Sequence, residues 1–113
     1  MNDNYATPAH IKRVFDGWFD PCPLNSPSGD GLKVPWGERT FVNPPYSNPA
    51  PWVTKAIEES RQGKTIVMLL RVDTSTKWFA ALVAADAEVL WFSRRLHFSK
   101  GPANFASMLV ILK

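Results

Sequence analysis

Apolar runs along the chain are separated by polar, proline-rich and glycine-containing segments, as in a folded globular protein. The run at residues 65–70 is apolar after its first threonine, and such runs are typical of strands buried on both faces of a sheet. Four other runs, at residues 18–20, 40–42, 88–92 and 107–112, also favour extended structure. The pattern therefore predicts a sheet of about five strands.

Helical spacing of apolar residues occupies the intervals between these runs. A short helix is expected near the start of the chain, with Thr7 as its N-cap and Pro8 at the first helical position. A second helix precedes the run at residues 65–70 and carries Lys55 and Glu59 at the i, i+4 spacing of an ion pair. A third helix follows that run and begins among several capping residues at 73–76. This alternation predicts an α/β fold, with one antiparallel strand near the C-terminus.

Composition narrows the class of protein. The 113 residues suffice for a single domain, spanning 1–113, and 45% of them are hydrophobic. No apolar run approaches the roughly 20 residues of a membrane span, and the first residues lack the layout of a signal peptide. One cysteine and two histidines give no metal-ligand spacing. We therefore expect a cytoplasmic protein, in the host cell if it is viral, without a metal ion or a membrane partner.

The run at residues 40–42 stops abruptly at Asn43-Pro44-Pro45-Tyr46. Neither proline can donate a hydrogen bond to a sheet, so the strand must end here, at the edge where open α/β folds bind ligands. The Asn43 side-chain oxygen and the Pro44 carbonyl can each accept one N–H of an amino group, which directs the nitrogen lone pair toward an electrophile. Pro45 aims Tyr46, whose ring offers a flat surface to a displaced base. These four residues are the predicted catalytic site, and a proline-stiffened turn is the plainer alternative.

Charge is distributed unevenly along the chain, whose net charge is +3. Residues 1–60 hold five Lys/Arg and seven Asp/Glu, whereas residues 61–113 hold eight and three. Basic residues interleaved with aromatic ones follow the run at residues 88–92, namely Arg94, Arg95, His97 and Lys100. This mixture suits a phosphate backbone beside a displaced base, although a solvated basic loop has the same composition. With Ser47 and Asp73, which follow two predicted strands, these residues are the nucleic-acid-binding candidates.

The proline corner resembles the catalytic motif of amino-methyltransferases that use S-adenosylmethionine (AdoMet), above all the DNA adenine-N6 enzymes. Further segments come in the order seen in small phage-type DNA N6-adenine methyltransferases and span nearly the whole chain. They are Tyr5-Ala6-Thr7-Pro8, Phe19-Asp20-Pro21-Cys22-Pro23, Asp30-Gly31-Leu32, Asn43-Pro44-Pro45-Tyr46-Ser47, Asp73-Thr74-Ser75-Thr76-Lys77-Trp78-Phe79 and Arg95-Leu96-His97-Phe98. The ordered set is more specific than any of its members apart from the catalytic motif.

This resemblance implies a minimal Rossmann-like methyltransferase with a mostly parallel sheet, in which residues 24–37 are too few for the usual second and third strand–helix units. It implies methyl transfer from AdoMet to the N6 amino group of adenine, with DNA as the partner. Asp20 would then lie near the charged methionine end of AdoMet and Asp30 near its ribose hydroxyls. The complete set of expected cofactor-binding residues is Tyr5, Thr7, Pro8, Asp20, Pro21, Cys22, Asp30 and Asn43.

Two alternatives stay open at this level. Leu24-Asn25 stands where larger methyltransferases carry a glycine-rich cofactor turn, so a nucleic-acid-binding module without AdoMet is one alternative. An AdoMet-dependent enzyme acting on another amine, in an RNA base or a glutamine side chain, is the second. The chain shows no obvious target-recognition domain, so base specificity would come from residues 24–37 and 93–104, from a second subunit in a homodimer, or be loose.

Overall fold

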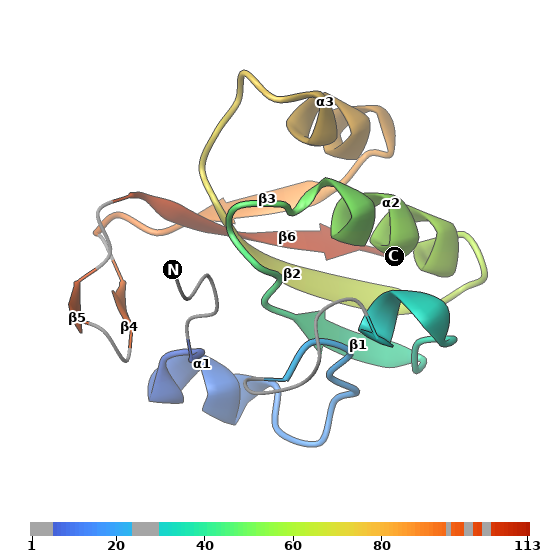
Figure 1. Ribbon diagram of the computed structural model, residues 1–113, viewed down its shortest axis with the longest axis horizontal. Helices are drawn as coiled ribbons and strands as arrows, with labels where there is room; N and C mark the ends of the chain where they lie inside the picture. The colour runs from blue at the N-terminus through green and yellow to red at the C-terminus, as the bar shows by residue number, and fades with distance from the viewer. Residues whose placement is uncertain (1–5, 24–29, 95, 99–100, 103–104) are drawn as a thin grey trace.

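Helices alternate with strands along the chain, which confirms the α/β prediction (Figure 1). The computed structural model describes residues 6–23, 30–94, 96–98, 101–102 and 105–113. The elements in these ranges are α1 (Ala9–Val14), the 3-10 helix η1 (Asp30–Lys33), β1 (Arg39–Val42), α2 (Ala50–Ser60), β2 (Thr65–Arg71), α3 (Lys77–Ala84), β3 (Glu88–Trp91), β4 (His97–Phe98), β5 (Gly101–Pro102) and β6 (Ser107–Leu112).

The main sheet has the strand order β1-β2-β6-β3. Strands β1 and β2 are parallel, and β6 runs antiparallel to both of its neighbours, β2 and β3. The predicted antiparallel strand near the C-terminus is thus present. Three of the four strands share one direction, but because β6 lies between two of them, only one pair of neighbouring strands is parallel.

The expected fifth strand, at residues 18–20, is reduced among the described residues to a single bridge. Phe19 forms an isolated parallel bridge with Thr40, and its N–H donates to the Arg39 carbonyl at 2.9 Å. Pro21 and Pro23 follow at once, and because proline has no N–H to donate, the ladder cannot continue. The prediction of about five strands therefore overestimates the described sheet by one.

Two segments that were expected to be irregular contain short elements. Residues 30–33 form η1, and residues 97–98 and 101–102 pair as the antiparallel strands β4 and β5. Elements of two to four residues are too short to show a hydrophobic period in the sequence, so neither η1 nor the β4–β5 pair was predicted.

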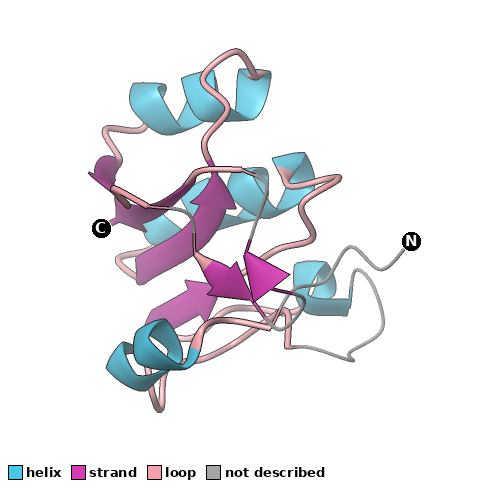
Figure 2. Ribbon diagram, turned by 90° about the vertical axis from the view of Figure 1, so that its left-hand side faces the viewer, coloured by secondary structure: helices cyan, strands magenta, loops and turns pink. Residues whose placement is uncertain are grey.

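The two faces of the sheet have separate hydrophobic clusters. Along β2, Ile66, Met68 and Leu70 pack on the face covered by α2 and α3, whereas Val67 and Leu69 pack on the face that α1 partly covers. Figure 2 shows α2 and α3 on one side of the sheet and α1 on the other. All five side chains are buried, as predicted for a strand with two covered faces.

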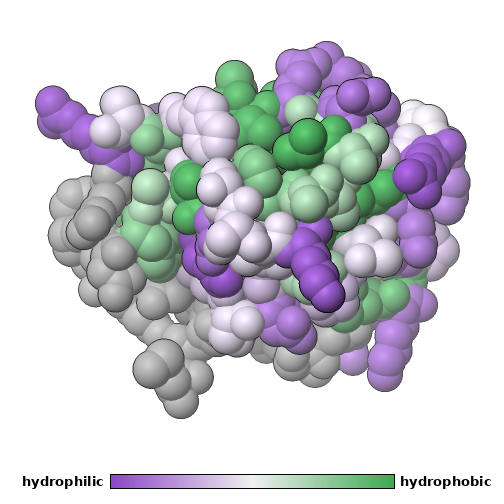
Figure 3. All heavy atoms as spheres, turned by 90° about the horizontal axis from the view of Figure 1, so that it is seen from above, coloured by the Kyte–Doolittle hydropathy of each residue, from purple (hydrophilic) through white to green (hydrophobic). Residues whose placement is uncertain are grey.

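The face carrying α1 is covered less completely than the other. An apolar groove of about 480 Å³ runs along it, lined by residues of α1, β2, β3 and β6. Val14 of α1 is 70% exposed and Leu90 of β3 is 54% exposed. Seen from above, the molecule also presents hydrophobic patches between hydrophilic ones (Figure 3).

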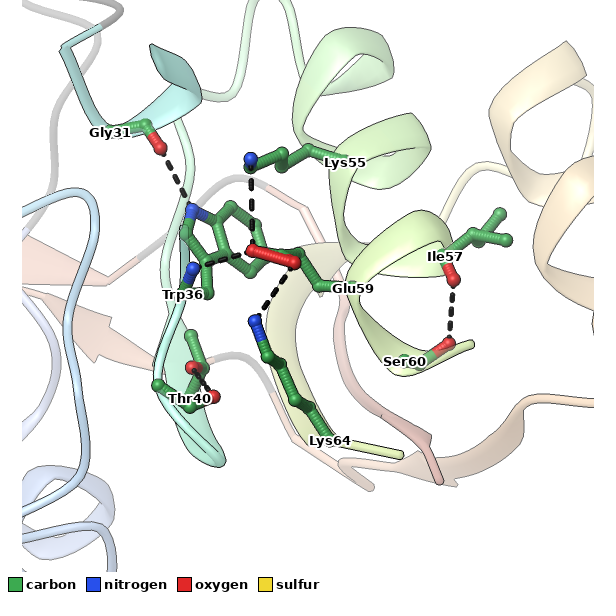
Figure 4. A network of polar contacts seen from close by, with 9 residues as sticks. Gly31, Trp36, Thr40, Lys55, Ile57, Glu59, Ser60 and Lys64 are labelled. Carbon is green, nitrogen blue, oxygen red and sulfur yellow. Dashed lines mark hydrogen bonds and ion pairs between the residues drawn. The ribbon is translucent and has the colours of Figure 1, made fainter. Parts of the chain in front are cut away.

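A buried ion network joins α2 to the loop that leads into β1 (Figure 4). Glu59 is 2% exposed and accepts a hydrogen bond from the Trp36 N–H at 2.5 Å. Lys64 Nζ lies 3.0 Å from the other carboxylate oxygen, and Lys55 Nζ lies 3.7 Å from the first, the predicted i, i+4 pair. Burial by itself raises the pKa of Glu59, but the Trp36 N–H and the two lysines outweigh it and leave the pKa below its ordinary value.

This network extends toward the segment that precedes the sheet. The Trp36 indole N–H donates to the Gly31 carbonyl at 2.8 Å. A Cβ atom at Gly31 would lie 1.8 Å from the carbonyl oxygen of Pro21, so only glycine permits this approach of the two backbones. The contacts from Glu59 through Trp36 to Gly31 therefore end directly beside the Asp20-Pro21-Cys22 segment.

No helix in the described ranges is long and apolar enough to cross a bilayer. Within the same ranges, no group of three or more His, Cys, Asp or Glu residues is arranged to hold a metal ion.

Candidate active site

Asn43 directly follows the last residue of β1, at the sheet edge where the sequence placed it. It is half-buried, and its side-chain N–H donates to the Thr7 hydroxyl at 3.2 Å. The prediction that Thr7 is the N-cap of the first helix is wrong. Pro8 occupies that position, without a side-chain capping bond. The hydroxyl contacts an amide 36 positions away, a non-local contact that capping preferences do not anticipate.

A hollow of about 260 Å³ opens beside Asn43. Four of the predicted site residues line it: Thr7, Asp20, Cys22 and Asn43. Sequence reasoning missed the other lining residues, which are Ala6, Lys12, Phe15, Asp16, Gly17, Trp18 and Phe41. One sequence signal could have indicated two of them: Lys12 and Asp16 are four positions apart, a spacing that places two charged residues on the same side of a helix.

The acidic wall of the hollow is shaped by a local turn. Asp20 Oδ1 accepts a hydrogen bond from the Cys22 N–H at 2.9 Å. Partial burial of the carboxylate raises the pKa of Asp20, although the Cys22 N–H and the nearby charge of Lys12 oppose this change. Burial and the adjacent Asp20 raise the pKa of Cys22 to about 11, so its thiol is neutral at pH 7 and is not a nucleophile.

Among the described residues, the other cofactor-binding candidates do not line the hollow. Pro8 is buried at the start of α1, and Pro21 is buried against Gly31. Asp30 is exposed as the first residue of η1. Tyr5 lies outside the described residues, as does the Leu24-Asn25 segment.

Tyr46 is packed inside the protein in this structure. It is 6% exposed, and its ring centroid lies 4.8 Å from that of Phe105, with the two planes 84° apart. Leu96 belongs to the same hydrophobic cluster. The flat surface that was expected to receive a base is therefore covered by protein side chains, because the ring contributes to the core on the α1 face. Pro44 is buried and Pro45 half-buried.

The nucleic-acid-binding candidates are only partly described. Ser47 and Arg94 are exposed. Asp73 is half-buried, and hydrogen bonds from Ser75, with its hydroxyl 2.6 Å away, lower the pKa of Asp73. His97 lies in β4, but the placement of its side chain is outside the description, and so are Arg95 and Lys100.

Arg71, at the end of β2, was not predicted as a site residue. Its guanidinium donates to the carbonyl oxygen of Tyr46, in the turn that follows Asn43. The two residues are 25 positions apart, so no local pattern indicates the contact.

A family model described as DNA N-6-adenine-methyltransferase (Dam) matches residues 1–108. The chain belongs to the Dam family. This confirms the resemblance that was carried by the ordered motifs, above all Asn43-Pro44-Pro45-Tyr46.

Two curated relatives carry the same description. A protein of Haemophilus phage HP1 (strain HP1c1), named DNA N-6-adenine-methyltransferase, is 44% identical over 108 residues, covering 80% of this chain and 62% of the relative. A protein of the same name from Escherichia phage T1 is 30% identical over 112 residues, covering 85% of this chain and 47% of the relative. The chain thus spans about half to three fifths of the length of these Dam-family relatives. No solved structure matches it.

Proposed function

We propose that this chain transfers a methyl group from AdoMet to the N6 amino group of adenine in DNA. Membership of the Dam family and the names of the two phage relatives support this reaction. The observation that carries the proposal is the placement of Asn43, at the end of β1, on the wall of a hollow, with its amide hydrogen-bonded to Thr7. The shared direction of β1, β2 and β3 and the opposed β6 support a minimal Rossmann-like methyltransferase fold.

The lining of the hollow suits AdoMet in its charge and in its aromatic surface. Asp16 and Asp20 outnumber Lys12 there, so the wall favours a ligand with an ammonium and a sulfonium group. Phe15, Trp18 and Phe41 supply aromatic surface for an adenine ring; a further set of polar contacts comes from Thr7 and Asn43. The volume lies just below the roughly 300–1,000 Å³ common for small-molecule sites. When bound, AdoMet supplies a methyl group on a positively charged sulfur.

The chain's own contribution to the reaction is to orient the amine. With the Asn43 amide N–H directed to Thr7, its oxygen is directed to the opposite side, where it accepts one N–H of the adenine amino group. The Pro44 carbonyl accepts the second N–H. Both contacts draw the nitrogen lone pair out of the ring system and toward the hollow. The amine loses its proton after alkylation, so no strong general base is required.

The position of Tyr46 adds one requirement. Because the ring is buried against Phe105, in a cluster that also contains Leu96, a flipped adenine stacks on Tyr46 only after this packing opens. Both belong to the segment between β3 and β6, which also carries Arg94. DNA binding to this segment and entry of the base are therefore coupled in the proposed mechanism.

The test is methyl transfer by the purified chain with labelled AdoMet, offered in parallel DNA, RNA and glutamine-containing peptides. We expect N6-methyladenine in DNA, identified by mass spectrometry of nucleosides. Asn43→Ala should lower the rate at least about 100-fold, as removal of one positioned contact to the reacting group does in other enzymes. Asn48→Ala is the matched control, because Asn48 is an exposed amide in the same loop.

Each other outcome selects an alternative. Full activity of Asn43→Ala overturns the assignment of the catalytic corner. Label in RNA or peptide alone changes the acceptor. Absence of AdoMet binding by calorimetry favours a nucleic-acid-binding module, and sedimentation of the active species tests whether it is a homodimer.

A further inference from the structure

A single side chain, that of Arg71, joins three segments at the carboxyl edge of the sheet. Its Nη1 donates to the Tyr46 carbonyl oxygen in the turn after β1. Its Nη2 lies 3.9 Å from Asp73 Oδ2 in the loop after β2. The guanidinium carbon lies 5.8 Å from the ring centroid of Trp78, in the first turn of α3. The contacts of one residue therefore connect the catalytic turn with the rest of the edge.

The contact with Tyr46 bears directly on the geometry of the amine site. Asn43 and the Tyr46 carbonyl are at opposite ends of a four-residue turn that begins where β1 stops. Its two prolines have no N–H, so neither of them can donate a hydrogen bond to the sheet. A hydrogen bond from a cation is about twice as strong as one between neutral groups. Arg71 thus supplies a charge-assisted anchor from β2 to the end of this turn.

The shape of arginine suits this role better than lysine does. Its planar fork places two nitrogens on two different acceptors while its flat face lies toward an indole. The side chain of Arg71 is 27% exposed, so most of it is enclosed by these partners. An ammonium group carries the same charge but reaches only one of the acceptors at a time.

We propose that Arg71 is a positioning residue for methyl transfer, which holds the Asn43–Tyr46 turn in its reactive geometry through the Tyr46 carbonyl. The inference rests on the proposed function for its catalytic consequence, but not for the anchoring itself. Arg71 acts through the turn and does not touch the substrate. The rival role is a contact to a DNA phosphate, because an arginine at the rim of a DNA-binding site commonly serves that purpose.

The variants Arg71→Lys and Arg71→Ala test the proposal, with Arg94→Ala as the comparison for an exposed arginine. We expect Arg71→Ala to lower kcat roughly 10- to 100-fold, since a small displacement of a reacting group has effects of this size. The KM for AdoMet should stay within about twofold, because Arg71 does not line the hollow. Arg71→Lys should recover little of the rate that Arg71→Ala loses. Added guanidinium ion, below denaturing concentration, should restore part of the activity of Arg71→Ala.

Two further readouts separate the rival roles. If Arg71 anchors the turn, the salt dependence of DNA binding stays as in the wild type, whereas loss of a phosphate contact reduces its log–log slope by about one. Hydrogen exchange at residues 46–48 should accelerate in Arg71→Ala and not in Arg94→Ala, whether or not the protein methylates DNA. The exchange result thus tests the anchor even if the proposed reaction is wrong.

Three results would overturn the proposal. They are an unchanged kcat in Arg71→Ala, a reduced salt slope with unchanged exchange in the turn, and a uniform loss of stability, kcat and affinity that guanidinium does not rescue. The last result would indicate a general structural role.

Discussion

The polar groups at the two ends of β1 and β2 differ in burial and in how fully they are hydrogen-bonded. At the amino ends, Glu59 is buried, and both of its carboxylate oxygens are engaged by Trp36 and two lysines. At the carboxyl ends, Asn43 is half-buried, contacts Thr7 and borders a hollow. A buried charge with every oxygen engaged fixes one geometry, whereas a half-buried amide beside an open volume can accept a ligand. The same pair of strands therefore has one end that holds the fold and one that is suited to chemistry.

The largest expected effect comes from breaking the amino end. Glu59→Ala leaves the Trp36 N–H buried without its acceptor and removes the partner of Lys64. We expect the free energy of unfolding to fall by about 2–4 kcal/mol, measured by urea denaturation. Glu58→Ala, an exposed residue of the same helix, should change it by less than about 0.5 kcal/mol. Equal effects of the two substitutions would show that the network contributes nothing specific.

A smaller loss of unfolding free energy is expected from a change at Gly31, which lies between the Glu59 network and the segment that lines the hollow. Gly31→Ala places a Cβ atom 1.8 Å from the Pro21 carbonyl oxygen, so the two backbones must separate, at a cost of about 1–3 kcal/mol. Because Pro21 lies between Asp20 and Cys22, calorimetry should also show weaker AdoMet binding.

The control for this substitution is Gly63→Ala. Gly63 has a φ of +88°, so alanine there is strained, but its Cβ would meet no other atom and it does not line the hollow. The Gly63→Ala protein should be less stable than the wild type but should bind AdoMet with unchanged affinity. Unchanged affinity in Gly31→Ala as well would separate the amino-end network from the hollow.

At the carboxyl end, Thr7→Val removes the hydroxyl but keeps the shape of the side chain. The Asn43 amide then loses its contact with the Thr7 hydroxyl, and we expect kcat to fall about tenfold, which corresponds to roughly 1.4 kcal/mol. Thr7→Ser keeps the hydroxyl and should stay near the wild-type rate. If serine and valine lower kcat equally, packing rather than the hydrogen bond is what matters at this position.

The smallest expected effect is on the pH dependence of stability, through the carboxylate of Glu59. The pKa of Glu59 in the folded protein lies below its ordinary value of 4.5, so its ionised form favours folding. This contribution is complete above pH 4.5 and is lost as the pH falls through the lower folded value. Unfolding midpoints measured from pH 7 down to pH 3 should therefore decline more in the wild type than in Glu59→Gln. A parallel decline would assign the acid sensitivity to other carboxylates.

Local patterns predicted the buried strand β2 and the Lys55–Glu59 pair. The mostly parallel sheet that was also predicted is not confirmed, because β1 and β2 are the one parallel pair of neighbours in the described sheet. The apolar run of β2 and the i, i+4 spacing of Lys55 and Glu59 depend on neighbours in sequence, and both are confirmed. The position of Asn43 followed from the inability of proline to continue a strand. Each of these predictions needed only a short stretch of chain.

Contacts between distant residues account for most of what was missed. Thr7 was interpreted as a helix cap because capping is local, yet its hydroxyl meets Asn43. Arg71 reads as an ordinary strand end, and its partner Tyr46 belongs to another strand's turn. Burial of Tyr46 under Phe105 depends on packing that motif chemistry does not encode. The position of the Asn43–Tyr46 turn could thus be predicted from sequence, but the contacts that support it could not.

Cys22 provides the hollow with a built-in chemical reporter. It is the only cysteine of the chain and it lines the hollow. With a pKa of about 11, roughly one thiol in a thousand is ionised at pH 8, so alkylating reagents react with it slowly. A molecule occupying the hollow shields the sulfur further. The rate of iodoacetamide labelling therefore measures ligand occupancy directly, at a single atom and with no methyl acceptor present.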